Sequence, residues 1–185
     1  MKNKVLQNNT QIFLIYAFIF FGIVLRFLPH PANFAPIGAL ALFSGAKIKG
    51  WQGLIVPLLA LFISDIFLGF YSWQVMVCVY GGFAIMMMLG RWAGKRKWYY
   101  LLPACLTGSI IFFIVTNLAV WAFTPLYLKT LPGLIHCYVM ALPFFRNSLS
   151  GDIIYSGLLF GLWSLAQTVV KYSQLKLRRV WWGKY

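Results

Sequence analysis

The sequence predicts an all-α integral membrane protein, a bundle of six transmembrane helices, and three observations carry this prediction. Of the 185 residues, 62% are hydrophobic and only 10% are charged, whereas a soluble domain carries about 25% charged residues. Hydropathy divides the chain into six apolar stretches, and a backbone inside lipid must satisfy its own hydrogen bonds by forming helices. The Lys and Arg residues gather between alternate stretches, as expected for a polytopic membrane protein.

The apolar stretches are bounded by proline, glycine or charged residues. The predicted helices of this single domain (1–185) are residues 11–28, 34–46, 54–70, 73–90, 100–123 and 151–170. At 1.5 Å per residue, the second is too short to cross a hydrocarbon core of about 30 Å. We therefore expect it to be buried among the others, tilted, or preceded by a non-helical segment through Pro29 to Pro36.

The distribution of the cations predicts the orientation. Thirteen of the 16 Lys and Arg residues lie at the two ends of the chain, near residues 47–49 and within 91–97, and only Arg26, Lys129 and Arg146 lie on the other side. By the positive-inside rule, both termini and the basic tail 171–185 are cytoplasmic. Because the charge is spread over four segments, we interpret it as a topology signal that contacts the lipid bilayer, and not as a nucleic-acid site.

Polar residues converge near the predicted outer face. The only two acids are Asp65, about five residues below the outer end of the third helix, and Asp152, at the start of the last. Polar groups inside a membrane are costly and mark functional sites by default. The structural alternative is that Asp65 pairs with Arg26 or Arg146, and that Asp152 caps the N-terminus of its own helix.

The connection 124–150 is long, apolar and aromatic. Connections of this length are usually functional. We expect a short helix between Pro132 and Pro143 that covers the outer mouth as a lid, or else an interfacial anchor in the headgroup layer.

Cys78 is the single residue that points most specifically to a ligand site, because its helix face combines an amide, a thiol and two positions without side chains. Gln74 lies one turn above it, and Gly81 and Gly82 lie one turn below. This face leaves room for a bulky ligand beside a soft sulfur atom. The alternative is that Cys78 is a small packing residue and that the glycines allow close helix contact.

Several sequence patterns are absent from the chain. It contains no P-loop motif, so it has no ATP site of that kind, and no zinc-protease or serine-hydrolase motif. Its pairs of small residues, Ala41 with Gly45, Gly90 with Gly94, and Gly157 with Gly161, have the spacing of helix contacts.

Four blocks of sequence resemble the BtuM-type cobalamin transporters, bacterial membrane proteins similar to the substrate-binding S-components of energy-coupling-factor (ECF) transporters. The blocks are PANFAPIGALALFSGA, PLLALFISDIFLGFYSWQVMVCVYGGF, TNLAVWAF and LPGLIHCYVMALPFFRNSLSGDIIYSGLLFG. They cover most of residues 26–162, and their order is more specific than any one block.

The resemblance implies cobalamin uptake across the bacterial cytoplasmic membrane, with the Cys78 thiolate as an axial ligand of cobalt. If the thiolate displaces cyanide from cobalt, the protein would also decyanate its substrate. Either a shared ECF ATPase and coupling module would supply energy by docking on a small-residue face such as Ala41 with Gly45, or the protein would work alone. The remaining residues that would contact the corrin or its amide groups are Gln74, Gly81, Gly82, Asn33, Phe34, Asp65, Tyr71, Trp73, Asn117, Arg146 and Asn147. The alternatives are an S-component or permease for another vitamin-like molecule, and a structural membrane protein without a ligand.

Overall fold

The computed structural model describes most of the chain after the first apolar stretch. The described residues are 12, 13, 16, 17, 20, 24, 25, 31, 33–48 and 50–182, without the side chains of 54, 56, 60 and 173–182. These residues contain helices and no strand. Most of the predicted helix 11–28, including Arg26, and residues 183–185 of the basic tail lie outside the described residues.

The helices follow the hydropathy pattern closely. The elements are α2 (Ile37–Lys47), α3 (Gln52–Leu68), α4 (Trp73–Ala93), the 3-10 turn η1 (Trp98–Tyr100), α5 (Leu101–Phe123) and α6 (Leu131–Trp182). The predicted helices 34–46, 54–70, 73–90 and 100–123 are confirmed to within three residues at each end. Three segments are long and apolar enough to cross a membrane, namely Trp73–Ala93, Trp98–Phe123 and Leu131–Tyr172. The all-helical class is therefore confirmed, whereas a count of six spans is not.

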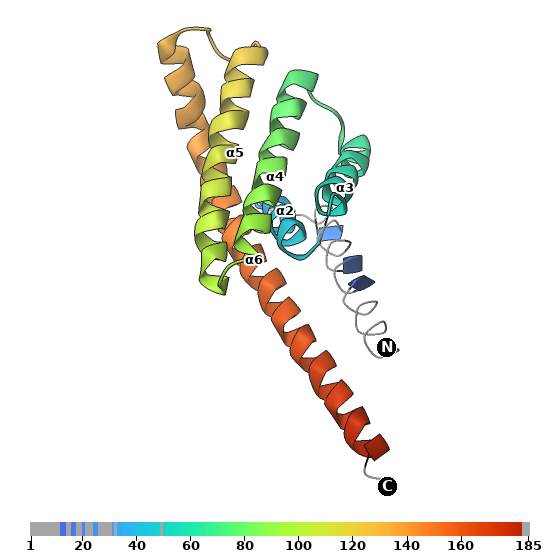
Figure 1. Ribbon diagram of the computed structural model, residues 1–185. Helices are drawn as coiled ribbons and strands as arrows, with labels where there is room; N and C mark the ends of the chain where they lie inside the picture. Colours follow the sequence, from blue (N-terminus) through green and yellow to red (C-terminus); the bar gives the residue numbers. More distant parts are fainter. Residues whose placement is uncertain are drawn as a thin grey trace.

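The structure differs from the prediction in the segment before the last helix. Residues 131–150, predicted as part of a lid loop, belong to α6, which continues for 52 residues, so the connection after α5 is short. Pro132 lies in the first turn of α6, where proline fits a helix without loss of a hydrogen bond. Pro143 lies inside the helix, where proline is a common cause of kinks. In Figure 1, α6 changes direction between a part beside α5 and a longer part that leaves the bundle.

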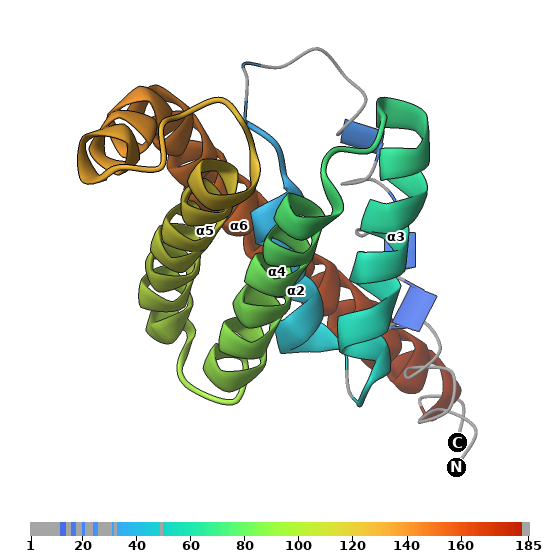
Figure 2. The same ribbon diagram turned by 90° about the horizontal axis from the view of Figure 1, so that it is seen from above.

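The short α2 lies at the centre of the bundle. Its residues from Gly38 to Gly45 are buried, which confirms the predicted burial of the second helix. Helix α4 packs against α2 on one side and α5 on the other, and Figure 2 shows α2 enclosed by the longer helices. At 1.5 Å per residue, its 11 residues extend about 16 Å, roughly half the thickness of a hydrocarbon core.

Glycines allow α2 and α4 to touch at the backbone. A Cβ atom added at Gly45 would lie 1.9 Å from the Met87 carbonyl oxygen, and one added at Gly90 would lie 2.1 Å from that of Leu42. The prediction of Ala41 and Gly45 as a docking face for a partner is therefore wrong, because both are buried against α4 within this chain. By contrast, a Cβ atom at Gly157 would meet nothing within 4 Å.

The helices alternate in direction, so the connections fall at two ends of the bundle. The α3–α4 and α5–α6 connections lie at one end, at the top of Figure 1, which we call the upper end. The α2–α3 and α4–α5 connections lie at the opposite, lower end. Cations described at the lower end include Lys47, Arg91 and residues 95–97.

Candidate functional site

A cavity of about 540 Å³ lies among the helices. Its lining residues come from the segment before α2 and from all five helices, and are Asn33, Ala35, Ile37, Gly38, Leu61, Leu68, Val75, Val79, Phe83, Met86, Phe112, Phe113, Thr116, Asn117, Val120, Ala141, Phe144, Phe145, Ser148 and Asp152. Its volume falls in the range of about 300–1,000 Å³ that is typical of small-molecule sites.

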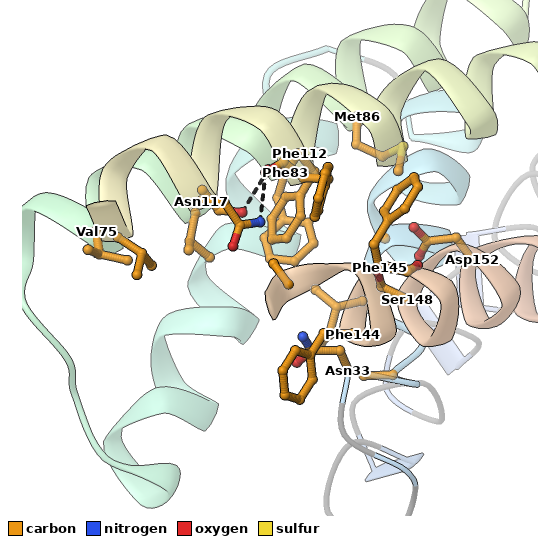
Figure 3. Close-up of a pocket in the computed structure, with 18 of the residues that line it drawn as sticks. Asn33, Val75, Phe83, Met86, Phe112, Asn117, Phe144, Phe145, Ser148 and Asp152 are labelled. Carbon is orange, nitrogen blue, oxygen red and sulfur yellow. Dashed lines mark hydrogen bonds between the residues drawn. The ribbon is translucent and has the colours of Figure 1, made fainter. Parts of the chain in front are cut away.

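The cavity extends from the upper end of the bundle to the start of α2. On α4, the lining residues Val75 to Met86 follow one face, and these 11 steps of the helix rise by about 16 Å. Leu68 is the last residue of α3 and Val120 lies in the last turn of α5. Figure 3 shows Val75 at one end of the cavity and Asp152 at the other. The cavity is therefore deep, and the first turn of α2 contributes to its floor.

Aromatic rings form much of the wall. The ring of Phe83 on α4 lies against that of Phe112 on α5, and their centroids are 4.6 Å apart. Aromatic pairs in proteins typically have centroids about 4.5–7 Å apart. The rings of Phe113 and Phe145 join α5 to α6 in the same way, with centroids 4.5 Å apart. These tilted pairs give the cavity a wall that is rigid and apolar.

Asp152 lies at the floor and is only 6% exposed. The Ser109 hydroxyl on α5 donates to its Oδ2 atom over 2.6 Å, and the backbone amide of Ala39 also bonds the carboxyl group. A Cβ atom at Gly38 would lie 2.1 Å from Oδ1, so only glycine lets the carboxyl group approach this closely. Three helices therefore meet at this one side chain.

The predicted role of Asp152 as the N-cap of its own helix is wrong, because α6 begins at Leu131 and Asp152 lies well inside it. Its carboxyl group instead lies at the first turn of α2, whose N-cap residue, Pro36, offers no side-chain hydrogen bond. A negative group is favoured at that position, because helix N-termini carry unpaired N–H groups and a partial positive charge. Asp152 thus caps α2 from another helix.

Four other polar residues line the cavity, namely Asn33, Thr116, Asn117 and Ser148. The Thr116 hydroxyl donates to the carbonyl of Phe112 over 2.8 Å, and the Asn117 amide donates to that of Phe113 over 2.8 Å. The Ser148 hydroxyl donates to the carbonyl of its own helix at Phe145. In each of these bonds the side chain is the donor. The Asn117 amide oxygen therefore remains able to accept a hydrogen bond from a ligand.

Asp65, the other acid, lies outside the lining. It is 1% exposed, and the Tyr80 hydroxyl on α4 donates to its Oδ2 atom over 2.7 Å. This bond ties α3 to α4 beside the cavity. Arg146, one of its two predicted partners, is exposed on α6, and the other, Arg26, lies outside the described residues.

Two of the predicted ligand-binding residues, Asn33 and Asn117, line the cavity. Cys78 and Gln74 are half-buried on α4, but neither is in the lining. At about 100° per residue, Cys78 lies roughly a quarter turn from the lining face of α4. The other predicted residues also lie outside the lining: Gly82 is buried, Phe34 and Asn147 are half-buried, and Tyr71, Trp73, Gly81 and Arg146 are exposed.

All three cysteines are free. The Cys137 thiol is buried and donates to the carbonyl of Asn117, and Cys105 lies 3.8 Å from the Ser156 hydroxyl. Within the described part of the chain, no group of three or more His, Cys, Asp or Glu side chains could hold a metal ion.

Sequence reasoning missed most of the wall contributed by residues 141–152. Ala141, Phe145, Ser148 and Asp152 follow a helical period of three and four residues on the face that lines the cavity. That period was visible in the sequence, but it runs through Pro143, which favoured a loop.

The fold and the cavity define an all-helical protein with helices of membrane-spanning length around a deep apolar pocket. A family model described as a family of unknown function (DUF6580) matches residues 6–175, and the chain belongs to this family. Comparison with curated proteins and with solved structures finds no match.

Proposed function

We propose that this protein is the substrate-binding membrane component of an uptake system for a small organic molecule. The observation that carries the proposal is the 540 Å³ cavity, which begins at one end of the bundle and closes near its centre. Ligand sites are typically concave and mostly apolar, with a few polar groups that orient the ligand. Thr116, Asn117 and Asp152 supply such groups within an otherwise aromatic and aliphatic wall.

The charge distribution supports a cavity that opens outward across the cytoplasmic membrane. Described cations gather at the lower end, where Arg91 donates to the carbonyl of Gly50 and Arg96 lies over the rings of Trp92 and Tyr100. The upper end, where the cavity begins, carries Lys129 and Arg146. Under the positive-inside rule the lower end faces the cytoplasm and the cavity faces out. Both termini are then cytoplasmic, as the sequence predicts.

Within this proposal the geometry favours a compact vitamin-like substrate. The lining reaches neither Cys78 nor the glycines below it, and a volume of 540 Å³ suits a drug-sized molecule. Cobalamin is the second candidate, which the resemblance to BtuM-type transporters favours. In that case the Cys78 thiolate would coordinate cobalt, and a Co–S bond would replace the Co–CN bond with release of cyanide.

Uptake also needs an energy source, and the sequence has no P-loop of its own. We propose that a separate ATPase and coupling module, shared with ECF transporters, supplies it. A reporter fused after Tyr185 tests the orientation, because the proposal requires the reporter to be detected in the cytoplasm.

The experiment that tests cavity binding is a pair of filling substitutions on α4. Val79 lines the cavity, whereas Val77 on the same helix is 62% exposed and does not. The purified protein in detergent is titrated with thiamin, riboflavin, biotin, pantothenate and cyanocobalamin. We expect one of them to bind, Val79→Trp to abolish its binding, and Val77→Trp to retain it. Binding that survives Val79→Trp, or no binding by any of the five, would contradict the proposal.

The visible spectrum distinguishes the two substrate candidates. Cobalamin bound through Cys78 should show a thiolate-shifted spectrum that is absent from Cys78→Ala. Cobalamin bound with the same spectrum in both proteins would reject the ligand role of Cys78, and failure to bind cobalamin while a smaller vitamin binds would establish the compact substrate.

A further inference from the structure

The formal charge in the cavity lining is negative only. Asp152 is the only lining residue with a formally charged side chain, and none of the described Lys, Arg or His residues lines the cavity. The cations at the two ends of the bundle include Lys47, which lies over the rings of Phe160 and Trp163, and Lys129, whose ammonium group donates to the carbonyls of Trp121 and Thr124. Within the described part of the chain, the cavity therefore holds an acid without a basic partner.

The Asp152 carboxyl group accepts hydrogen bonds from two neighbouring helices. Both hydrogen bonds to its carboxyl group come from donors, the Ser109 hydroxyl and the Ala39 backbone amide, and donors stabilise a carboxylate. The first turn of α2 adds a partial positive charge. A carboxylate offers about four lone-pair positions, so these two donors leave it able to accept further hydrogen bonds from the cavity side.

A buried charge is stable only when it is paired or well hydrogen-bonded. The partial charge of a helix terminus is about half of one elementary charge, so it balances the carboxylate incompletely. Because the cavity wall is apolar, the remaining negative potential is screened less than it would be in water. A bound cation would complete the pairing at the floor.

The rings near the floor suit the same kind of ligand. Phe112, Phe113 and Phe145 all line the cavity, and Figure 3 places Phe145 beside Asp152. The faces of aromatic rings attract cations, especially in sites shielded from water. An apolar ligand body would pack against the same rings, so one wall serves both parts of an amphipathic cation.

We infer that the cavity selects organic cations, molecules with an amine or quaternary ammonium group on an apolar or aromatic body, and that Asp152 is the counter-charge. The inference rests on the proposed function and deepens it by naming the substrate class. A ligand whose polar end is a carboxylate or phosphate would meet Asp152 as a like charge and should bind poorly.

Three indole probes that differ in charge test this inference on the wild-type protein. They are tryptamine, which is a cation at neutral pH, indole, which is neutral, and indole-3-propionate, which is an anion. Binding to the detergent-solubilised protein is measured by calorimetric titration. We expect tryptamine to bind at least about tenfold more tightly than indole-3-propionate, with indole between them.

The two acids of the chain provide matched variants. Asp152→Asn keeps the size of the side chain but removes its charge, so tryptamine should lose its advantage over indole. Asp65→Asn makes the same change at a buried acid outside the lining, so the advantage should remain. If Asp152→Asn does not fold, the order in which the wild-type protein binds the three probes is the test of the inference.

Equal or tighter binding of indole-3-propionate would overturn the inference, as would an advantage of tryptamine that survives Asp152→Asn. Absence of binding by all three probes would also reject it, since the cavity would then have no affinity for an amphipathic cation. Each of these outcomes leaves the proposed function to be judged separately by Val79→Trp and the vitamin titration.

Discussion

Substitution of Gly90 by alanine tests the backbone contact between α2 and α4, which holds the floor of the cavity in place. The new Cβ atom would lie 2.1 Å from the Leu42 carbonyl oxygen, and real Cβ contacts essentially never fall under 3.0 Å. The obstructing atom belongs to a helix backbone and cannot rotate away. Helix α2 must therefore move away from α4 by about 1 Å, which is resisted by the dense packing of a protein interior.

The magnitude follows from two opposing effects. Overpacking a well-packed contact costs typically about 1–3 kcal/mol, and we expect the upper part of that range because a whole helix must shift. Replacing glycine by alanine inside a helix returns up to about 1 kcal/mol. The net loss in the free energy of unfolding is then about 2 kcal/mol, or a fall in Tm of about 4–8 °C for a chain of this size.

The assay is thermal unfolding of the purified protein in detergent, followed by tryptophan fluorescence. Gly157→Ala is the matched control, because a Cβ atom at that helical position meets nothing within 4 Å. The control should gain up to about 1 kcal/mol and melt slightly higher than wild type. If Gly90→Ala melts as high as Gly157→Ala, the close approach of α2 and α4 is wrong.

Three further substitutions each remove the hydrogen bonds of one side chain. Tyr80→Phe removes the donor to buried Asp65 at 2.7 Å and should lower the free energy of unfolding by about 1.5–3 kcal/mol. Ser109→Ala removes the 2.6 Å bond to Asp152, should cost a similar amount, and is measured by the same thermal unfolding. Lys129→Met removes the ammonium group at the last carbonyls of α5, so hydrogen exchange should accelerate at the end of α5 while global stability changes by less than about 1 kcal/mol.

Each of these variants has a counterpart that should behave like wild type. Tyr172 is 70% exposed, so a Tyr80→Phe protein as stable as Tyr172→Phe would show that the bond to Asp65 contributes nothing. Ser148 bonds only its own helix, so equal effects of Ser109→Ala and Ser148→Ala would argue against a special contact at Asp152. Unchanged exchange in Lys129→Met would exclude Lys129 as a cap of α5.

The helices could be predicted because their hydropathy pattern is that of membrane-spanning segments, which is a strong signal in a sequence. Continuous apolar runs bounded by Gly, Pro or charge located α2 to α5 within three residues, since any chain in hydrocarbon must form helices. The start of α6 could not be located in this way. Pro132, Gly133 and Pro143 are loop residues by local propensity, yet the first two fall in the opening turn and the third inside the helix. Tertiary packing overrides such propensities.

The candidate site was less predictable than the helices. The predicted positions of the polar residues identified Asn33 and Asn117, which both line the cavity. Polar side chains in membrane-spanning segments are costly, so they usually have a function. The direction in which a side chain points depends on the rotation of each helix about its axis. When a helix is apolar on all sides, its sequence does not define that rotation. The sequence therefore could not show that Val79 lines the cavity and neighbouring Cys78 does not.

The sequence by itself determined the helical class, the presence of helices apolar and long enough to cross a membrane, and the rarity of acids, because these follow from composition and hydropathy summed over many residues. Only the tertiary structure decided what the acids contact. Asp152, an apparent helix start in the sequence, caps α2 across the bundle at Gly38 and Ala39, and it also accepts a hydrogen bond from Ser109 on α5. The contact with α2 joins residues more than a hundred positions apart in sequence, and it exists because a glycine leaves space where two helices approach a third.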